Sequence, residues 1–498
     1  MKRKMFGLVL PLCLGSGLVL GACSNGDAKE NSQASSAPAA TGTEQKKELA
    51  PVELTWYLPG NVQADIASVE KAVNEYIKPK LNATIKLNMV TSGSYPEKMN
   101  TLLSSGEAFD LLWTANWSFL YEPNASKGAF LELDGLLSQY APELKASLPS
   151  MIWEDAKLKS KLYAIPNYQI SAKVYGFVVQ KRFAEKYGLD PAKVKGLRDL
   201  EPFLAQVKQN EPDLIPYTPG EYVHQMYGYD GVNNVSVYKR GDKNFQVVDF
   251  VDTPEYMAHH KLLHEWYSKG YIPKDIATAD MSQFKSAGKI VSNFGVTLKP
   301  GGEAEEKTRN GGHDAIFIPL SQPEFTGVQA TLTAISRTSK NPERAMMLLN
   351  LINTDSTLYN LLSFGIEGKH YEKAGTNTIR KIKDSGYAMD NWRLGNVTNG
   401  YLIEGQAENT WELTKKMNES AVIPQIFGFK FDTTPVKTEY ANVTATRKEF
   451  QKAIETGTVN PEEYIPKYVE ALKKSGNDKI LAEHQRQLDA WLKEKGMK

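Results

Sequence analysis

The sequence predicts a mixed α/β protein built from two units, each a mainly parallel sheet flanked by helices. Its 498 residues are too many for one ordinary domain and suit about two or three. From residue 51, apolar patterns with the period of a strand and of a helix follow one another along the chain. A second region of the same kind begins near residue 174. Strands that alternate with helices are typical of parallel sheets covered on both faces.

The first unit is predicted from five consecutive segments. Residues 52–57 and 84–89 alternate between apolar and polar side chains, as strands do. Residues 66–76 and 96–105 carry apolar side chains at helical spacing. Residues 109–113 are almost entirely apolar and predict a short buried strand. The predicted order is therefore β-α-β-α-β.

The second unit is predicted from the same two patterns. Strand-like and helical runs occupy 174–179, 182–187, 197–209, 245–251, 289–296 and 315–320. Thr253 is a good N-cap and Pro254 suits a first helical turn, so a helix is expected from there to Gly270. Two amphipathic helices are expected at the C-terminus, over 461–476 and from Ile480 onward.

The N-terminus has the pattern of a secretory signal peptide. Three basic residues precede the apolar run 5–20, which is short for a membrane span. The run ends in Leu-Gly-Ala-Cys23, which resembles the bacterial lipobox. The resemblance implies cleavage after residue 22 and a lipid on the Cys23 thiol, with palmitate among its acyl chains. Residues 24–50 contain few bulky apolar side chains, so 23–50 are expected to form a disordered tether.

Composition removes several classes of function. Lys and Arg number 59 against 58 Asp and Glu, and no basic stripe is present, which argues against nucleic-acid binding. Both cysteines, Cys13 and Cys23, lie in the first 23 residues. The rest of the chain can therefore hold no disulfide, Cys-based metal site or catalytic cysteine.

Motifs for chemistry are scarce. The sequence contains no GxxxxGK[ST] loop, no GxSxG elbow and no strand followed by GxGxxG. His260 and His264 are four residues apart, but the residues around them do not match the HExxH zinc-binding motif. A solvated helix face is favoured for these two residues and for His259. We expect no cofactor and no metal, although a calcium ion bound by carboxylate-rich loops stays open. A pair of carboxylates for glycoside cleavage also stays open.

Polar and aromatic residues gather at the predicted carboxyl ends of the first three strands. In open α/β sheets ligands bind outside these ends. Sugars suit such a site, because their C–H faces pack on aromatic rings and their hydroxyls need polar partners. Trp113 and Trp117 could instead pack under a loop. The candidate ligand-binding residues of this rim are Asn61, Ser92, Tyr95, Trp113, Asn116 and Trp117.

Several segments resemble the family-1 extracellular solute-binding proteins of ABC importers, especially the LipO-type lipoproteins of Gram-positive bacteria with a C-terminal domain of unknown function. The resemblance covers essentially 51–498. The segments that carry it, besides the lipobox, are LYAIP at 162–166, ISRTSKNPERA at 335–345, FGIEGKHY at 364–371, GFKFD at 428–432 and EHQRQLDAW at 483–491.

The resemblance implies a two-lobe clamp of the type II periplasmic-binding-protein kind with a helical C-terminal extension. Lobe 1 would comprise 51–165 and about 321–365, and lobe 2 would comprise 166–320 and about 366–498. The chain would cross between the lobes near 166–174, 320–330 and 365–390. Residues beside these crossings could face the cleft, although burial of Trp392 is as plausible. These candidates are Tyr168, Gln169, Trp392, Arg393 and Asn396.

The resulting hypothesis is a lipid-anchored, monomeric solute-binding protein on the extracellular face of the cell membrane, in a Gram-positive bacterium. It would capture a carbohydrate, of which an oligosaccharide is favoured, by cleft closure and deliver it to an ABC permease. We expect no catalysis. The alternatives are a surface-anchored polysaccharide-degrading enzyme and a binding or sensor protein for a non-sugar solute.

Overall fold

The computed structural model describes residues 49–220, 223–231 and 235–498. The predicted signal peptide, Cys23 and nearly all of the predicted tether lie outside the described residues. The first sheet has the strand order β2-β1-β3-β16-β6. Its strands are β1 (Val52–Pro59), β2 (Ala83–Val90), β3 (Leu111–Thr114), β6 (Ala164–Pro166) and β16 (Leu332–Ile335). β1 is parallel to β2 and β3, whereas β16 runs antiparallel to β3 and β6.

The helices that cover this sheet bury their apolar stripes. In α1 (Ile66–Leu81) the side chains of Val69, Val73 and Ile77 are fully buried, which confirms the helical spacing seen in the sequence. Each such side chain contributes about 1.5–3 kcal/mol by leaving water. The other helices of this region are α2 (Tyr95–Ser105), α3 (Tyr121–Ser126), α4 (Asp134–Tyr140), α5 (Pro142–Ser147), α6 (Ser150–Ala156), α12 (Pro342–Thr354) and α13 (Ser356–Phe364). A short hairpin, β4 (Lys157–Leu158) and β5 (Lys161–Leu162), lies between α6 and β6.

The second sheet has the order β14-β8-β13-β9 and is mixed. Its strands are β8 (Gly176–Gln180), β9 (Ile215–Thr218), β13 (Ile290–Gly295) and β14 (Ala315–Pro319). β13 is parallel to β9, but β8 is antiparallel to both β13 and β14. The expectation of a mainly parallel sheet is therefore wrong here. The reason is that β8 enters directly from the crossing at 166–174, just as β16 enters the first sheet from the second crossing.

Helices and a small sheet surround the second sheet. The helix α9 (Pro254–Ser268) begins as the sequence predicts, with the Thr253 side chain accepting a hydrogen bond from the Tyr256 amide. The strand expected over 245–251 is only β12 (Val247–Val248), because the Asp249 carboxylate caps a 3₁₀ turn that begins at Phe250. The other elements are α7 (Lys181–Lys186), α8 (Glu201–Asn210), β10 (Tyr229–Gly231), β11 (Val237–Lys239), α10 (Met281–Ser286) and α11 (Gly302–Arg309).

Two hydrophobic clusters divide the chain into two lobes. The cluster around the first sheet defines the first lobe, and the cluster around the second sheet defines the second lobe. β7 (Ala172–Lys173) pairs with β15 (Glu324–Phe325), and both strands belong to chain segments that cross between the lobes. Further along the chain, Tyr387, Met389 and Ala421 pack in the first cluster and Val436 packs in the second.

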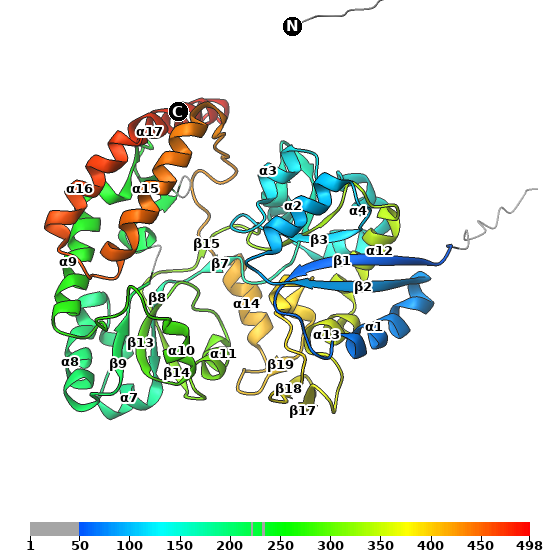
Figure 1. The fold of residues 1–498 in the computed structure, drawn as a ribbon, viewed down its shortest axis with the longest axis horizontal. Helices are drawn as coiled ribbons and strands as arrows, with labels where there is room; N and C mark the ends of the chain where they lie inside the picture. Colours follow the sequence, from blue (N-terminus) through cyan, green and yellow to red (C-terminus); the bar gives the residue numbers. More distant parts are fainter. Residues whose placement is uncertain (1–48, 221–222, 232–234) are drawn as a thin grey trace, which may run out of the picture. The chain divides into compact units, whose positions relative to one another are not determined.

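The C-terminal helices complete the second cluster. These are α15 (Lys437–Glu455), α16 (Pro461–Lys474) and α17 (Asn477–Glu494), which contribute Val443, Ile465, Tyr468 and Ile480. Figure 1 shows the three helices side by side, with α16 against α9. Before them the chain forms β17 (Tyr371–Lys373), β18 (Thr378–Lys381), β19 (Leu402–Ile403) and α14 (Thr410–Glu419). No helix among the described residues combines the length and apolar composition that a bilayer crossing needs.

Candidate ligand-binding site

Three indole rings meet at the carboxyl end of β3. Trp113 lies in the strand, Trp117 in the loop after it, and Trp392 in a 3₁₀ turn 275 residues further on. The centroid of the Trp113 ring is 5.4 Å from that of Trp117 and 6.2 Å from that of Trp392, and the last two are 6.4 Å apart. Trp113 is fully buried, while Trp117 is 59% exposed. This tryptophan cluster therefore presents an exposed indole on a buried one.

Hydrogen bonds to the loop before β16 fix the orientation of the cluster. The Trp113 Nε1–H donates to Thr331 Oγ1 at 2.8 Å, and the Trp117 Nε1–H donates to the Ala330 carbonyl at 2.9 Å. The Asn116 amide donates to the Gln329 carbonyl at 2.8 Å. The exposed Trp117 face is thus held in place without a ligand, which reduces the entropy that binding must overcome.

Arg393 joins the Trp392 turn to the end of β1. Its guanidinium lies 4.6 Å from the centre of the Trp392 ring, forms an ion pair with Asp390 at 3.2 Å, and donates to the Pro59 carbonyl. Burial lowers the pKa of Arg393. A Cβ at Gly60 would come within 3.0 Å of Arg393 Nη1, and Gly60 also has a φ of +145°, so only glycine suits this close approach. Arg393 therefore acts through protein contacts in this structure.

The rim residues predicted from the sequence separate into exposed and buried groups. Asn61, Ser92 and Asn116 are exposed just after β1, β2 and β3, as the parallel pairing requires. Tyr95 is fully buried instead, and burial raises its pKa. Its hydroxyl accepts from the Trp113 amide at 2.9 Å and lies 2.8 Å from the Trp113 carbonyl. Tyr95 thus supports the strand end from the core, because its side chain points beneath the sheet edge.

The candidates near the crossings also divide into two groups, those held by protein contacts and those that line a cavity. The Tyr168 hydroxyl accepts from Asn418 Nδ2 at 3.2 Å, and burial raises its pKa. Asn396 is buried and caps a 3₁₀ turn, since its Oδ1 accepts from the Thr398 amide at 3.0 Å. By contrast, Gln169 and Trp392 line a cavity. Tyr168, Arg393 and Asn396 are therefore committed to protein contacts, whereas Gln169 and Trp392 face open space.

This cavity has a volume of about 850 Å³. One wall comes from the first lobe and from 379–411, and the other comes from α11 and the turn before it. Sequence reasoning missed several residues of the first wall. Among them are Lys381, Tyr401 and Trp411, whose side chains lie beyond the strand ends on which the sequence prediction was based. The signal available in the sequence was an aromatic residue, Trp411, in the first turn of a helix.

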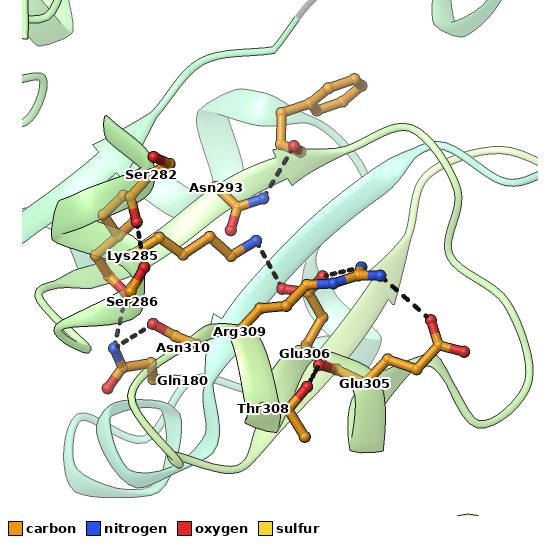
Figure 2. Close-up of polar contacts among 12 residues, drawn as sticks. Gln180, Ser282, Lys285, Ser286, Asn293, Glu305, Glu306, Thr308, Arg309 and Asn310 are labelled. Atoms are coloured by element: carbon orange, nitrogen blue, oxygen red, sulfur yellow. Dashed lines mark hydrogen bonds and ion pairs between the residues drawn. The ribbon is translucent and has the colours of Figure 1, made fainter. Parts of the chain in front are cut away.

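Ion pairs hold the α11 wall of the cavity in place. Figure 2 shows Lys285 of α10 reaching Glu306, at 2.6 Å, and Arg309 between Glu305 and Glu306. At the end of α11, Gln180 Nε2 donates to Asn310 Oδ1 at 3.3 Å. These contacts tie α11 to α10 and β8, so this wall moves as part of the second lobe.

The structure corrects the expectation that the histidines of α9 lie on a solvated helix face. His259 and His260 are buried rather than solvated, and the His260 Nδ1–H donates to the Tyr256 carbonyl at 2.8 Å. Burial lowers the pKa of both, to about 4 for His260. No group of three or more His, Cys, Asp or Glu side chains in the described part of the chain is placed to hold a metal ion.

Two segments match known protein families. Residues 60–357 match the bacterial extracellular solute-binding protein family, and residues 425–493 match a domain of unknown function, DUF3502. A carbohydrate ABC transporter substrate-binding protein of Streptococcus pneumoniae is 32% identical over 449 residues, covering 88% of this chain and 89% of the relative. Lipoprotein LipO of Bacillus subtilis is 22% identical over 320 residues, covering 58% and 61%.

Solved structures with the same fold include the N-glycan transport solute-binding protein NgtS of Streptococcus pneumoniae. It is 30% identical and matches with a TM-score of 0.79 over 89% of this chain and 100% of NgtS. The complex of NgtS with Man1GlcNAc matches with a TM-score of 0.75, at 29% identity over 89% and 100%. Its complex with Man5GlcNAc matches with a TM-score of 0.71, at 30% identity over 89% and 99%.

Proposed function

Because the chain belongs to the bacterial extracellular solute-binding protein family, we propose that it captures an oligosaccharide and delivers it to an ABC importer. The observation that carries the ligand class is Trp117, a 59% exposed indole with a fixed orientation next to Trp392, which lines the cavity. An exposed aromatic ring held in one orientation is suited to packing against a ligand.

Sugar chemistry fits both parts of this site. The C–H face of a hexose packs on an indole, and its hydroxyls both donate and accept hydrogen bonds. Trp117 and Trp392 supply the aromatic faces, and Gln169 supplies an amide at the edge of the cavity. The exposed Asn61 and Asn116 add amides on the other side of the cluster.

The names of the relatives indicate which sugars to test first. One relative is a carbohydrate ABC transporter substrate-binding protein, and NgtS has been crystallised with Man1GlcNAc and Man5GlcNAc. Mannose oligosaccharides ending in GlcNAc are therefore the first probes for this chain.

Capture would use closure of the two lobes about the crossings. The first lobe would include 51–165 and about 321–420, and the second lobe 166–320 and about 421–498. The cores support this division, since 387–421 pack with the first cluster and 436–480 with the second. Closure needs only a few backbone segments to change conformation. A ligand that touches both lobes shifts the population toward the closed form.

The proposed location is the extracellular face of the cell membrane, with a lipid on Cys23 and an ABC permease as partner of the monomer. The LipO relative supports the lipoprotein assignment. Replacing Cys23 (Cys23→Ala) should release the chain from the membrane fraction and leave oligosaccharide affinity unchanged, because the anchor lies outside the described fold. Fractionation and calorimetric titration measure the two effects, and retention of the variant in the membrane fraction would contradict the proposal.

The experiment that tests the function is a calorimetric titration of the purified protein with Man1GlcNAc, Man5GlcNAc and a peptide of similar mass. We expect saturable binding of an oligosaccharide at one site and none of the peptide. Chromatography of the recovered sugar then asks whether bonds were cleaved. Unchanged sugar supports capture, new reducing ends indicate the enzyme alternative, and binding of the peptide alone would overturn the carbohydrate assignment.

A further inference from the structure

We propose that the cavity beside Trp392 is an inner subsite for the far end of an oligosaccharide, and that Trp411 determines how much affinity a longer ligand gains. This inference rests on the proposed function. It goes beyond that function by assigning the effect of ligand length to a particular residue.

The cavity adjoins the tryptophan cluster at Trp392. The Trp392 ring lies 6.4 Å from that of Trp117, and Trp392 also lines the cavity. A sugar chain whose first ring lies on Trp117 would therefore reach the cavity with its next units. The volume of about 850 Å³ falls in the range of about 300–1,000 Å³ that holds a drug-sized ligand, roughly two or three hexose rings.

Trp411 provides a second aromatic surface in this cavity. It lies in the first turn of α14, is half-buried against the first cluster and lines the cavity. Its Nε1–H donates to the Gly400 carbonyl at 2.8 Å, which fixes the ring as Ala330 fixes Trp117. The chain thus offers indoles at the entrance and inside the cavity, which suits a linear series of sugar rings.

The two walls meet beside Trp411. Gln406 Nε2 donates to the Gly301 carbonyl at 3.2 Å, which connects the first-lobe wall to the turn before α11. A Cβ on Gly301 would lie 2.8 Å from Thr410 Cγ2, and one on Gly405 would lie 3.3 Å from Ala304 Cβ. Because Ala304, Gly405 and Gln406 line the cavity, this contact closes one side of it and limits how far a ligand extends.

The charges of the walls are largely paired with each other. Lys299 and Glu305 are 2.8 Å apart, Lys307 and Asp314 are 2.9 Å apart, and Arg380 and Glu404 are 2.6 Å apart. Paired side chains still offer hydrogen-bond donors and acceptors to the hydroxyls of a sugar.

The test compares the disaccharide Man1GlcNAc with the hexasaccharide Man5GlcNAc on the full chain. In the Trp411→Ala variant we expect hexasaccharide affinity to fall at least ten-fold and disaccharide affinity to stay within two-fold. The Trp411→Phe variant keeps a ring on α14, and we expect it to recover part of the loss. The matched control is Trp153→Ala. Trp153 is a half-buried indole packed against the first hydrophobic cluster, and its Nε1–H donates to the Lys145 carbonyl. It does not line the cavity.

Each outcome decides the proposal. Equal loss for both sugars, or loss for the disaccharide alone, overturns the assignment of Trp411 to an inner subsite. Unchanged hexasaccharide affinity in Trp411→Ala overturns it as well. If wild-type protein binds neither sugar nor any oligosaccharide, the proposed function itself fails.

Discussion

The two lobes bury different kinds of side chain. Beside its strand ends the first lobe buries Trp113 and Tyr95, which support the exposed ring of Trp117. The second lobe buries His259 and His260 in its core, with the His224 ring packed on Phe250 nearby. The buried rings of the first lobe thus support the exposed ring of Trp117, whereas the second lobe buries histidines whose pKa values are lowered by burial. We therefore expect acid to weaken the second lobe more than the first.

The first lobe also holds a histidine, but in a different way. His370 Nδ1 accepts from the Ile366 amide at 2.8 Å, so its Nε2–H points to Asp65 Oδ2 at 2.7 Å. Lys369 and Ser68 also contact Asp65 and hold the pKa of this carboxyl well below its usual range. The His370 ring therefore faces a carboxylate, whereas the His260 ring donates to the neutral Tyr256 carbonyl.

The largest expected effect is loss of stability of the second lobe in acid. Burial lowers the pKa of His224 and His260 to about 4 each. The unfolded chain takes up these protons first, near pH 6.5, so the free energy of unfolding is highest above that pH and falls until about pH 4. The loss is up to roughly 3 kcal/mol for each histidine. Hydrogen exchange of α9 against that of α1, measured from pH 7 to pH 4, follows the two lobes separately.

A matched pair of variants on α9 tests the cause. The His260→Leu variant should lose less stability in acid than the wild type, whereas His264→Leu should follow the wild type, because His264 is only half-buried. Identical pH profiles for His260→Leu and the wild type would contradict the assignment to buried histidines.

The next effect is on the stability of the first lobe. Trp113→Ala removes a fully buried ring and should lower the free energy of unfolding by about 3–5 kcal/mol, as large-to-small core changes do. Urea unfolding measures it. A loss below about 1 kcal/mol together with abolished ligand binding would show that Trp113 contacts the ligand instead.

A smaller effect is expected on affinity alone. Trp117→Ala should weaken oligosaccharide binding by about 1–3 kcal/mol through loss of a stacking surface. Because Trp117 is exposed, the free energy of unfolding should change by less than about 1 kcal/mol. Calorimetric titration and urea unfolding separate the two quantities. Trp153→Ala is the control, and equal weakening of binding in both variants would remove the special role of Trp117.

Much of the first lobe follows from local sequence patterns. The alternation in 52–57 and the helical spacing from Val69 to Ile77 predict β1 and α1, since burial has the period of each element. The parallel order then brings the ends of β1, β2 and β3 together, so the positions of Asn61 and Trp117 could be predicted. The reversed direction of β8 could not, because strand direction depends on where the crossing enters the sheet.

Prediction of the candidate site from the sequence has the same limit. An aromatic residue at a strand end can point outward, as Trp117 does, or beneath the sheet edge, as Tyr95 does, and the sequence pattern is the same for both. Trp392 joins the site through contacts with Trp113 and Trp117, which are distant in the sequence, and Trp411 lines the same cavity as α11. Such contacts are set by packing, so Trp392 was predicted only by its nearness to an expected crossing, and Trp411 was missed.

The most direct test of the account is a crystal structure of the protein with Man5GlcNAc bound. We expect one sugar ring packed on the exposed face of Trp117, with the sugar chain continuing past Trp392 toward Trp411 and both lobes in contact with the sugar. A sugar bound to one lobe alone, or away from all three indoles, would contradict it.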